Sequence, residues 1–127
     1  MIFVKLGDPF VWSPISGRRR HLYVVVTDPD KNAGRFVVFN LTGSKSGPEA
    51  LTLKKGEHPF IDKDSDVNFG DGLIVTTEKI QRAIASGQAF PNEPMQMQLV
   101  QRIARFAKGH PAVTGDIEAM IIAQWSL

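Results

Sequence analysis

Two runs of β-branched and aromatic residues dominate the first half of the chain. Leu22 to Thr27 (LYVVVT) and Arg35 to Leu41 (RFVVFNL) are apolar almost throughout, without a clean alternation of apolar and polar positions. Strands buried on both faces have this composition, as in a small closed barrel. The segment between them, DPDKNAG, is rich in turn-forming residues. The pattern predicts an antiparallel hairpin around which the rest of the chain is organised.

Shorter apolar stretches on either side of this hairpin predict further strands, separated by turns that contain Gly and Pro. We expect these strands at Met1–Lys5, Phe10–Trp12, Leu51–Leu53 and Leu73–Thr76. The segment GSKSGPEA, from Gly43 to Ala50, has no periodicity and is expected to form a flexible loop. The carboxylate-rich DKDSDVNFGDG, which follows Ile61, is also expected to be a loop.

After Thr76 the spacing of apolar residues changes to the period of a helix. A first helix is expected to be capped by Thr76 or Thr77 and to end at Ser86–Gly87. A second is expected to start near Glu93–Pro94, and a third to span roughly Thr114 to Gln124. These elements predict a single α+β domain over 1–127, with a small antiparallel barrel in about 1–76 and a helical part in about 77–127.

Composition narrows the range of functions. The 127-residue chain has a net charge of only +2, so it is compatible with a nucleic-acid partner without requiring one. It has no cysteine, which excludes disulfides, thiolate metal sites and cysteine nucleophiles. Its start lacks the apolar core of a signal peptide, and it has no apolar run of about 18 residues. We therefore expect a cytoplasmic protein without a membrane partner.

The sequence predicts no metal or other cofactor. Asp62-Lys63-Asp64-Ser65-Asp66 resembles the opening of an EF-hand loop. However, Val67 stands where that loop needs glycine, and Leu73 stands where it needs a bidentate glutamate. No spacing of His, Asp and Glu suggests a zinc site, and no glycine-rich phosphate loop is present.

The densest charge in the chain is RRRH, Arg18 to His21, where the first long strand begins. Guanidinium groups can hold a phosphodiester, and histidine exchanges protons near neutral pH. A metal-free ribonuclease needs such a set: a base for the 2′-hydroxyl, cations for the charge on phosphorus, and an acid for the leaving oxygen. The alternative is a solvated basic loop that precedes a strand.

Two further residues are candidates for the same chemistry. Thr42 directly follows the second long run, and an antiparallel hairpin brings that end beside the start of the first, so we expect His21 and Thr42 at one rim. The Thr42 hydroxyl could bind the scissile phosphate, or it could make a hydrogen bond within the turn. His58, in GEHPF, could be a second acid or base, or a structural histidine before proline.

The segments LGDPFVW, GRRRHLYVVVT and FVVFNLTG resemble, in order and spacing, the PemK/MazF family of toxin endoribonucleases. That family has a G-[DE]-x-x-x strand, then R-R-P-V-L-V-x-S, then V-x-P-[IL]-T-S. The resemblance covers the chain up to about Gly43. It implies an SH3-like barrel, a homodimer, an antitoxin partner and metal-independent cleavage of single-stranded RNA.

Carried over by position, Thr42 matches the catalytic threonine of that family. A gap-free match of the apolar strand puts His21 where the family has its catalytic arginine, whereas a shift by one residue puts Arg20 there. The resemblance thus implies His21 as acid or base and Arg20 as phosphate clamp, with His58 as a second titrating group. Arg18 and Arg19 would bind RNA.

Two functions follow from these patterns. The first is a toxin-like endoribonuclease. The second is a non-catalytic SH3-like binding module for a protein or nucleic-acid partner, in which RRRH is only a basic contact. Both would share one fold, so the fold cannot separate them. The ribonuclease requires that His21, Thr42 and a guanidinium converge in one groove, whereas the binding module requires only an exposed patch.

Overall fold

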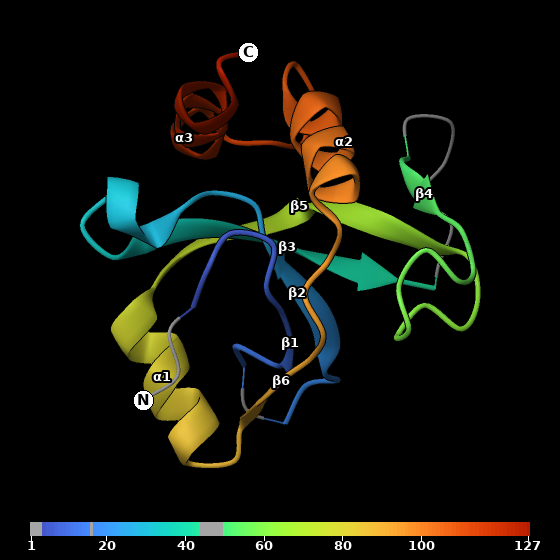
Figure 1. Cartoon of the computed structure of the whole chain (residues 1–127), viewed down its shortest axis with the longest axis vertical. Coiled ribbons are helices and arrows are strands. Elements are labelled where there is room, and N and C mark those ends of the chain that lie inside the picture. Colours follow the sequence, from blue (N-terminus) through green and yellow to red (C-terminus); the bar gives the residue numbers. More distant parts are fainter. Residues whose placement is uncertain (1–3, 16, 44–49) are drawn as a thin grey trace.

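The computed structural model describes residues 4–15, 17–43 and 50–127. Six strands and three α-helices form this part of the chain (Figure 1). In chain order the elements are β1 (Pro9–Trp12), β2 (His21–Val25), β3 (Arg35–Thr42), β4 (Thr52–Leu53), β5 (Ser65–Thr76), α1 (Thr77–Ala85), β6 (Ala89–Pro91), α2 (Met97–Ala107) and α3 (Gly115–Trp125). A short 3-10 turn, Pro29–Lys31, lies between β2 and β3.

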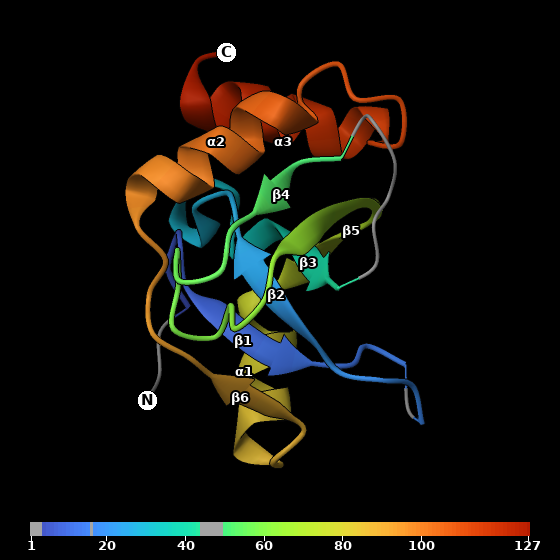
Figure 2. The ribbon, with the colours of Figure 1, turned by 90° about the vertical axis from the view of Figure 1, so that its right-hand side faces the viewer.

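The strands form one curled antiparallel sheet in the order β4-β5-β3-β2-β1-β6. The predicted α+β class and the predicted hairpin between β2 and β3 are therefore confirmed. The sheet is a half-barrel rather than the closed barrel that we expected, with β4 and β6 as its two edges. Figure 2 shows how strongly the strands turn from one end of the sheet to the other.

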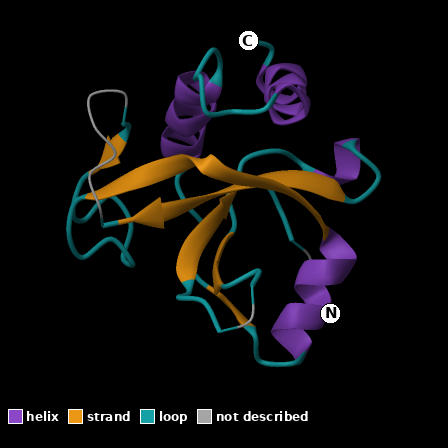
Figure 3. Ribbon diagram, turned by 180° about the vertical axis from the view of Figure 1, so that it is seen from behind, coloured by secondary structure: helices purple, strands orange, loops and turns teal. Residues whose placement is uncertain are grey.

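Helices cover both faces of the sheet. The helices α2 and α3 lie on one side of it, and α1 lies on the other (Figures 1 and 3). Successive residues of β2 therefore point into different cores: Val24 packs with the α2 and α3 side, and Val25 with the α1 side. Val25, Val37 and Val38 are fully buried, which confirms that the two long strands are covered on both faces.

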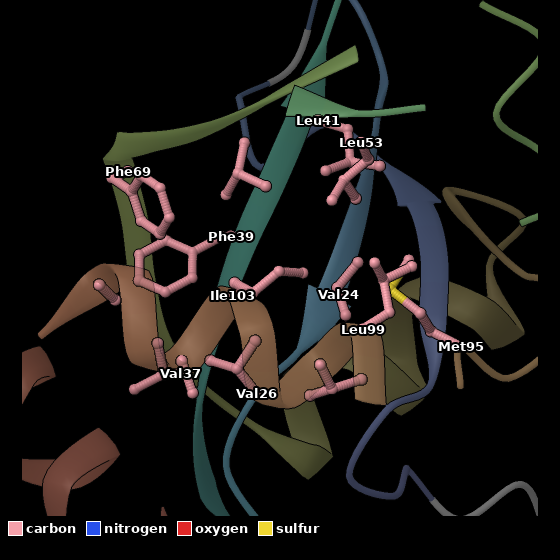
Figure 4. Close-up of a cluster of buried hydrophobic side chains, with 14 of the residues drawn as sticks. Val24, Val26, Val37, Phe39, Leu41, Leu53, Phe69, Met95, Leu99 and Ile103 are labelled. Carbon is pink, nitrogen blue, oxygen red and sulfur yellow. The ribbon is translucent and has the colours of Figure 1, made fainter. Parts of the chain in front are cut away.

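The larger core lies between the sheet and α2. Leu99 and Ile103 of α2 pack against Val24 of β2, Val26 just after that strand, and Phe39 of β3 (Figure 4). All five side chains are buried, and burying such side chains is the main source of folding free energy. The sequence places them at alternate positions in the strands and four apart in the helix, so each element presents one face to this core.

The C-terminal helix also holds the hairpin turn through hydrogen bonds. The Trp125 indole Nε1 donates to the carbonyl of Val26 at 2.8 Å. The Gln124 side-chain carbonyl accepts from the backbone amide of Asp28 at 2.8 Å. These contacts join the end of the described chain to the start of the β2–β3 connection. The hairpin is thus fixed at its turn, which leaves its other end to form a site.

The helix boundaries follow the predicted signals in α1 but not in α2. Thr76 caps α1, with its hydroxyl accepting from the Lys79 amide at 3.2 Å, and the helix ends at Ser86 and Gly87 as expected. In contrast, α2 begins at Met97 rather than near Glu93–Pro94. The preceding residues are extended because the backbone amide of Asn92 donates to the carbonyl of Pro9, which begins β1, and that of Met95 donates to Gly7, just before β1.

Three strand predictions need correction. The described residues of the expected first strand, Val4 and Lys5, are not in a strand, and residues 1–3 lie outside the described part. β5 begins at Ser65, so most of the expected carboxylate-rich loop is strand. β6 was not predicted, and it extends the sheet beyond residue 76 because its three residues pair with β1. Residues 44–49 of the expected loop also lie outside the described part.

No helix in the described part of the chain is both long and apolar enough to span a bilayer.

Candidate functional site

The hairpin strands separate at the end that carries the predicted site. The β2–β3 pairing runs from Val25–Val38 to Tyr23–Asn40. Beyond that point His21 pairs with β1, and Thr42 pairs with β5. The expected side-by-side arrangement of His21 and Thr42 at one rim is therefore not formed through strand pairing, because each strand continues along its other neighbour.

A hollow of about 400 Å³ opens beside the start of β2. Its walls come from the β1–β2 loop, the start of β2 and the middle of β5. Its lining residues are Ser13, Pro14, Ile15, Arg18, Arg19, His21, Tyr23, Gly70, Asp71, Gly72 and Leu73. The structure thus brings together three of the predicted residues, His21, Arg18 and Arg19. It adds two that we did not predict, Tyr23 and Asp71.

An irregularity in β5 forms one wall of the hollow. Val38 pairs with Leu73 and Asn40 pairs with Asn68, so residues 69–72 of β5 lie opposite the single residue Phe39. A bulge of this kind bends a strand and redirects its side chains. Glycine is needed at position 72, since a Cβ there would lie 2.5 Å from Cε1 of the Phe39 ring.

Asp71 carries the carboxylate of this wall. It is exposed, and its Oδ2 accepts a hydrogen bond from Asn68 Nδ2 at 2.9 Å. That bond holds the carboxylate at the bulge, on the same hollow as the His21 imidazole. The Asp71 carboxylate and the His21 imidazole therefore line one hollow together with two guanidinium groups.

Tyr23 lies at the floor of the hollow and is only 3% exposed. Its hydroxyl accepts a hydrogen bond from Asn40 Nδ2 at 3.3 Å. Burial raises the pKa of the Tyr23 phenol above its ordinary value of 10.0. The Asn40 hydrogen bond opposes this rise, and the charge of Asp71 adds to it. The phenol is therefore neutral at physiological pH and adds no charge to the site.

Arg20 does not line this hollow. Its guanidinium lies 5.0 Å from the centre of the Phe90 ring in β6, and it lines a second hollow on the α1 side. Arg18 and Arg19, in contrast, line both hollows. The geometry therefore favours Arg18 and Arg19, rather than Arg20, as the cations that share a hollow with His21.

His58 is buried in a different part of the molecule, with 3% of its surface exposed. Its Nε2 lies 2.6 Å from the carbonyl of Glu93, and its Nδ1 accepts from the Phe60 amide at 3.0 Å. Because Nδ1 accepts, Nε2 carries the proton and donates a hydrogen bond to the Glu93 carbonyl. Nδ1 bonds within the turn and Nε2 joins the turn to the segment before α2, so the geometry favours the structural alternative for His58.

Thr42 is half-buried at the end of β3, where it lies opposite Asp66 of β5. It is not among the residues that line either hollow. The carry-over of a catalytic threonine to Thr42 thus finds no support in the geometry of the hollow. The pairing of β3 with β2 ends at Asn40, and beyond it Thr42 pairs with β5.

Asp71 and Tyr23 were missed for different reasons. Tyr23 stands inside an apolar strand run, where an aromatic residue is expected to be core. Asp71 stands between two glycines in FGDG. An isolated glycine within a strand pattern suggests a bulge, and this signal was the available pointer to Asp71.

Among the residues that the structure describes, no three His, Asp or Glu side chains gather as a set of metal ligands.

Comparison with known proteins adds no family. No protein-family model matches the chain, and no curated protein matches its sequence. Function is therefore argued from the geometry of the hollow.

Proposed function

We propose that the chain is a metal-independent endoribonuclease of the PemK/MazF toxin type, which cleaves single-stranded RNA. The observation that carries the proposal is the hollow shared by His21, Asp71, Arg18 and Arg19. It offers two groups that can exchange protons and two permanent cations, which is the set that metal-free phosphodiester cleavage requires.

In the proposed step, the ribose 2′-oxygen attacks the adjacent phosphorus. A new bond forms from phosphorus to the 2′-oxygen, and the bond from phosphorus to the 5′-oxygen of the next nucleotide breaks. The products are a 2′,3′-cyclic phosphate and a free 5′-hydroxyl. The proton lost by the 2′-hydroxyl and the proton gained by the 5′-oxygen balance.

We assign the two proton transfers by what each side chain can do. A carboxylate accepts a proton, so Asp71 takes the proton of the 2′-hydroxyl. An imidazole can carry a proton to the leaving group, so His21 gives one to the 5′-oxygen. Arg18 and Arg19 stabilise the extra negative charge that develops on the phosphate oxygens. Tyr23 stays neutral and forms the floor.

The second candidate is the non-catalytic binding module, and a specific observation favours it. Thr42 and His58, which the resemblance and the sequence suggested for catalysis, do not line the hollow, so the expected convergence of His21, Thr42 and a guanidinium is not found there. Exposed Arg18 and Arg19 could then serve binding alone. An RNA that binds but is never cut would support this candidate.

The finer parts of the proposal come from the resemblance. They are an SH3-like barrel, a homodimer and an antitoxin partner, whereas the proposed cytoplasmic location comes from the signal-peptide pattern that the sequence lacks. The toxin role is tested by expressing the chain in bacteria with and without the reading frame next to its own. Growth arrest that the neighbour relieves supports the toxin role, whereas normal growth on expression of the chain alone contradicts it.

The chemistry is tested with purified protein and an end-labelled single-stranded RNA in the presence of a chelator. The proposal predicts fragments that end in a 2′,3′-cyclic phosphate. Asp71→Asn should lower the rate by about 10² or more, the usual size of a lost acid or base. Arg105→Gln, an exposed change on α2, is the control and should retain the rate. Cleavage that leaves 3′-hydroxyl ends would contradict the step.

A further inference from the structure

A second hollow, of about 1060 Å³, lies between the β1–β2 loop and α1. Its lining is strongly basic. The loop and the helix contribute five cationic side chains: Arg18, Arg19, Arg20, Lys79 and Arg82. None of the described residues that line it is Asp or Glu. We call this hollow the basic groove.

The carboxylate of Glu78, which pairs with Arg82, does not neutralise the basic groove. Glu78 Oε1 lies 3.5 Å from Arg82 Nη1, one helical turn away, and both side chains are about three-quarters exposed (77% and 73%). Exposed pairs of this kind are weak, and a polyanion competes with them readily. Lys79 also extends along the groove, with Nζ 5.8 Å from the centre of the Trp12 ring.

The basic groove adjoins the hollow that contains His21. Both are lined by Arg18 and Arg19 of the same loop. Tyr23, at the floor of one, and Trp12, which lines the other, belong to the same buried cluster, with ring centres 5.3 Å apart. The two hollows therefore lie on the same face of the sheet and meet under one loop.

We propose that the basic groove holds the phosphodiester backbone of the RNA strand beside the scissile phosphate, with Lys79 and Arg82 of α1 as phosphate contacts. This inference rests on the proposed function, because it extends the same site. Positive side chains alone would also suit an acidic protein segment. Single-stranded nucleic acid is favoured because the groove continues into the hollow where the phosphate would be cut.

An exposed aromatic ring supports the choice of nucleic acid. Phe90, which carries the Arg20 guanidinium over its ring, is 44% exposed. Proteins that bind single strands combine a basic groove with aromatic or arginine surfaces on which bases stack. An acidic peptide has no bases that could stack on Phe90 and Arg20.

The test measures binding of an uncleavable RNA, a 2′-O-methyl oligonucleotide of about ten nucleotides, which spans a groove of this kind. The double variant Lys79→Gln/Arg82→Gln is compared with Arg105→Gln/Lys108→Gln, which removes the same charge at the end of α2. All four side chains are exposed, so both variants are expected to fold. Circular dichroism on both proteins checks this.

The first variant should bind the oligonucleotide at least tenfold more weakly. Its salt dependence should also flatten, because each phosphate contact on a single strand contributes about 0.7 to the slope of log K against log salt. Loss of two contacts should lower the slope by about 1.4. The control should keep both the affinity and the slope of the unmodified chain.

Equal affinity and slope in the first variant and the unmodified chain would overturn the inference. Binding of a polyglutamate peptide that depends on Lys79 and Arg82, without binding of the oligonucleotide, would overturn it in favour of a protein partner. Since the oligonucleotide cannot be cleaved, failure of the proposed function is seen separately. RNA that is bound through Lys79 and Arg82 but never cut would support the basic groove as an RNA-binding site and contradict the proposed catalytic step.

Discussion

The Asn40 side-chain amide donates a hydrogen bond of 3.3 Å to the Tyr23 hydroxyl where β2 and β3 separate. Both side chains are at most 3% exposed. This contact closes the end of the paired hairpin. Past it, β2 carries His21 along β1, while β3 carries Thr42 along β5. The hollow that contains His21 therefore opens above this hydrogen bond.

The ionisation of Tyr23 can be measured directly, because the chain has only one tyrosine. Burial raises the pKa of Tyr23 above 10.0, and the Asp71 charge acts in the same direction. Ultraviolet absorbance of the phenolate should therefore show a midpoint above 10.0. The native phenol binds its proton more tightly than the unfolded one, so its contribution to the free energy of unfolding is full below pH 10 and is lost above it. A midpoint below the ordinary value would mean that the phenol is not buried beside a carboxylate.

The bulge in β5 makes a separate prediction at Gly72. An alanine Cβ there would come within 2.5 Å of the Phe39 ring, which is fully buried and has no free space to enter. We expect Gly72→Ala to lower the free energy of unfolding by about 1 to 3 kcal/mol, as overpacking does. Chemical denaturation measures this. Gly87→Ala is unsuitable as a control because Gly87 has a positive φ, whereas Gly115→Ala meets no atom within 4 Å. An equal effect at both sites would contradict the close approach.

His58 provides a test of the structural alternative. Its ring joins the Phe60 amide to the Glu93 carbonyl in a buried position. His58→Ala leaves these groups without their partner and should lower the free energy of unfolding by about 1 to 3 kcal/mol. The RNA-cleavage rate per folded molecule should stay unchanged. A large loss of rate in a variant of normal stability would return His58 to the catalytic set.

The lowered pKa of Glu57 predicts how the free energy of unfolding changes at acid pH. The Lys54 amide donates to Glu57 Oε2 at 2.7 Å, and this bond is the main reason that the pKa of Glu57 is lowered from 4.5. Burial opposes the change, and Arg102, with Nη1 3.0 Å from Oε1, supports it.

A lowered carboxylate pKa stabilises the fold above pH 4.5, and this contribution is lost as the pH falls through the native value. Glu57→Gln should therefore show a smaller loss of stability between neutral pH and acid. Denaturation at a series of pH values measures this, with Glu78→Gln on exposed α1 as the control. A steeper loss of stability in Glu57→Gln would contradict the direction of the pKa shift.

Local patterns were sufficient to predict the central hairpin and α1. Positions 24 to 26 are all valine, so this segment can bury its side chains only if both of its faces are covered. All three side chains are buried in the structure. The Thr76 cap and the Gly87 end of α1 are local signals too, set by backbone hydrogen bonds within one turn. Such features depend little on distant parts of the chain.

The features that were not predicted depend on contacts between distant segments. The three residues of β6 form a strand only because β1 offers an edge. Asn92 and Met95 stay extended because their backbone amides donate to Pro9 of β1 and to Gly7 just before it. At the site, Asp71 lines the hollow because β5 bulges where it pairs with β3. His21 and Thr42 are not paired, because His21 pairs with β1 and Thr42 pairs with β5. A sequence read locally does not contain these pairings.

The central claim is that His21 transfers a proton in RNA cleavage, and one comparison of rates tests it most directly. The rates of single-stranded RNA cleavage in chelator are measured for the unmodified chain, His21→Ala and His110→Ala, with folding checked by circular dichroism. His110 is a matched histidine outside the His21 hollow. The account predicts a rate reduced by about 10² or more in His21→Ala alone. An undiminished rate in folded His21→Ala, with the same 2′,3′-cyclic ends, would contradict it.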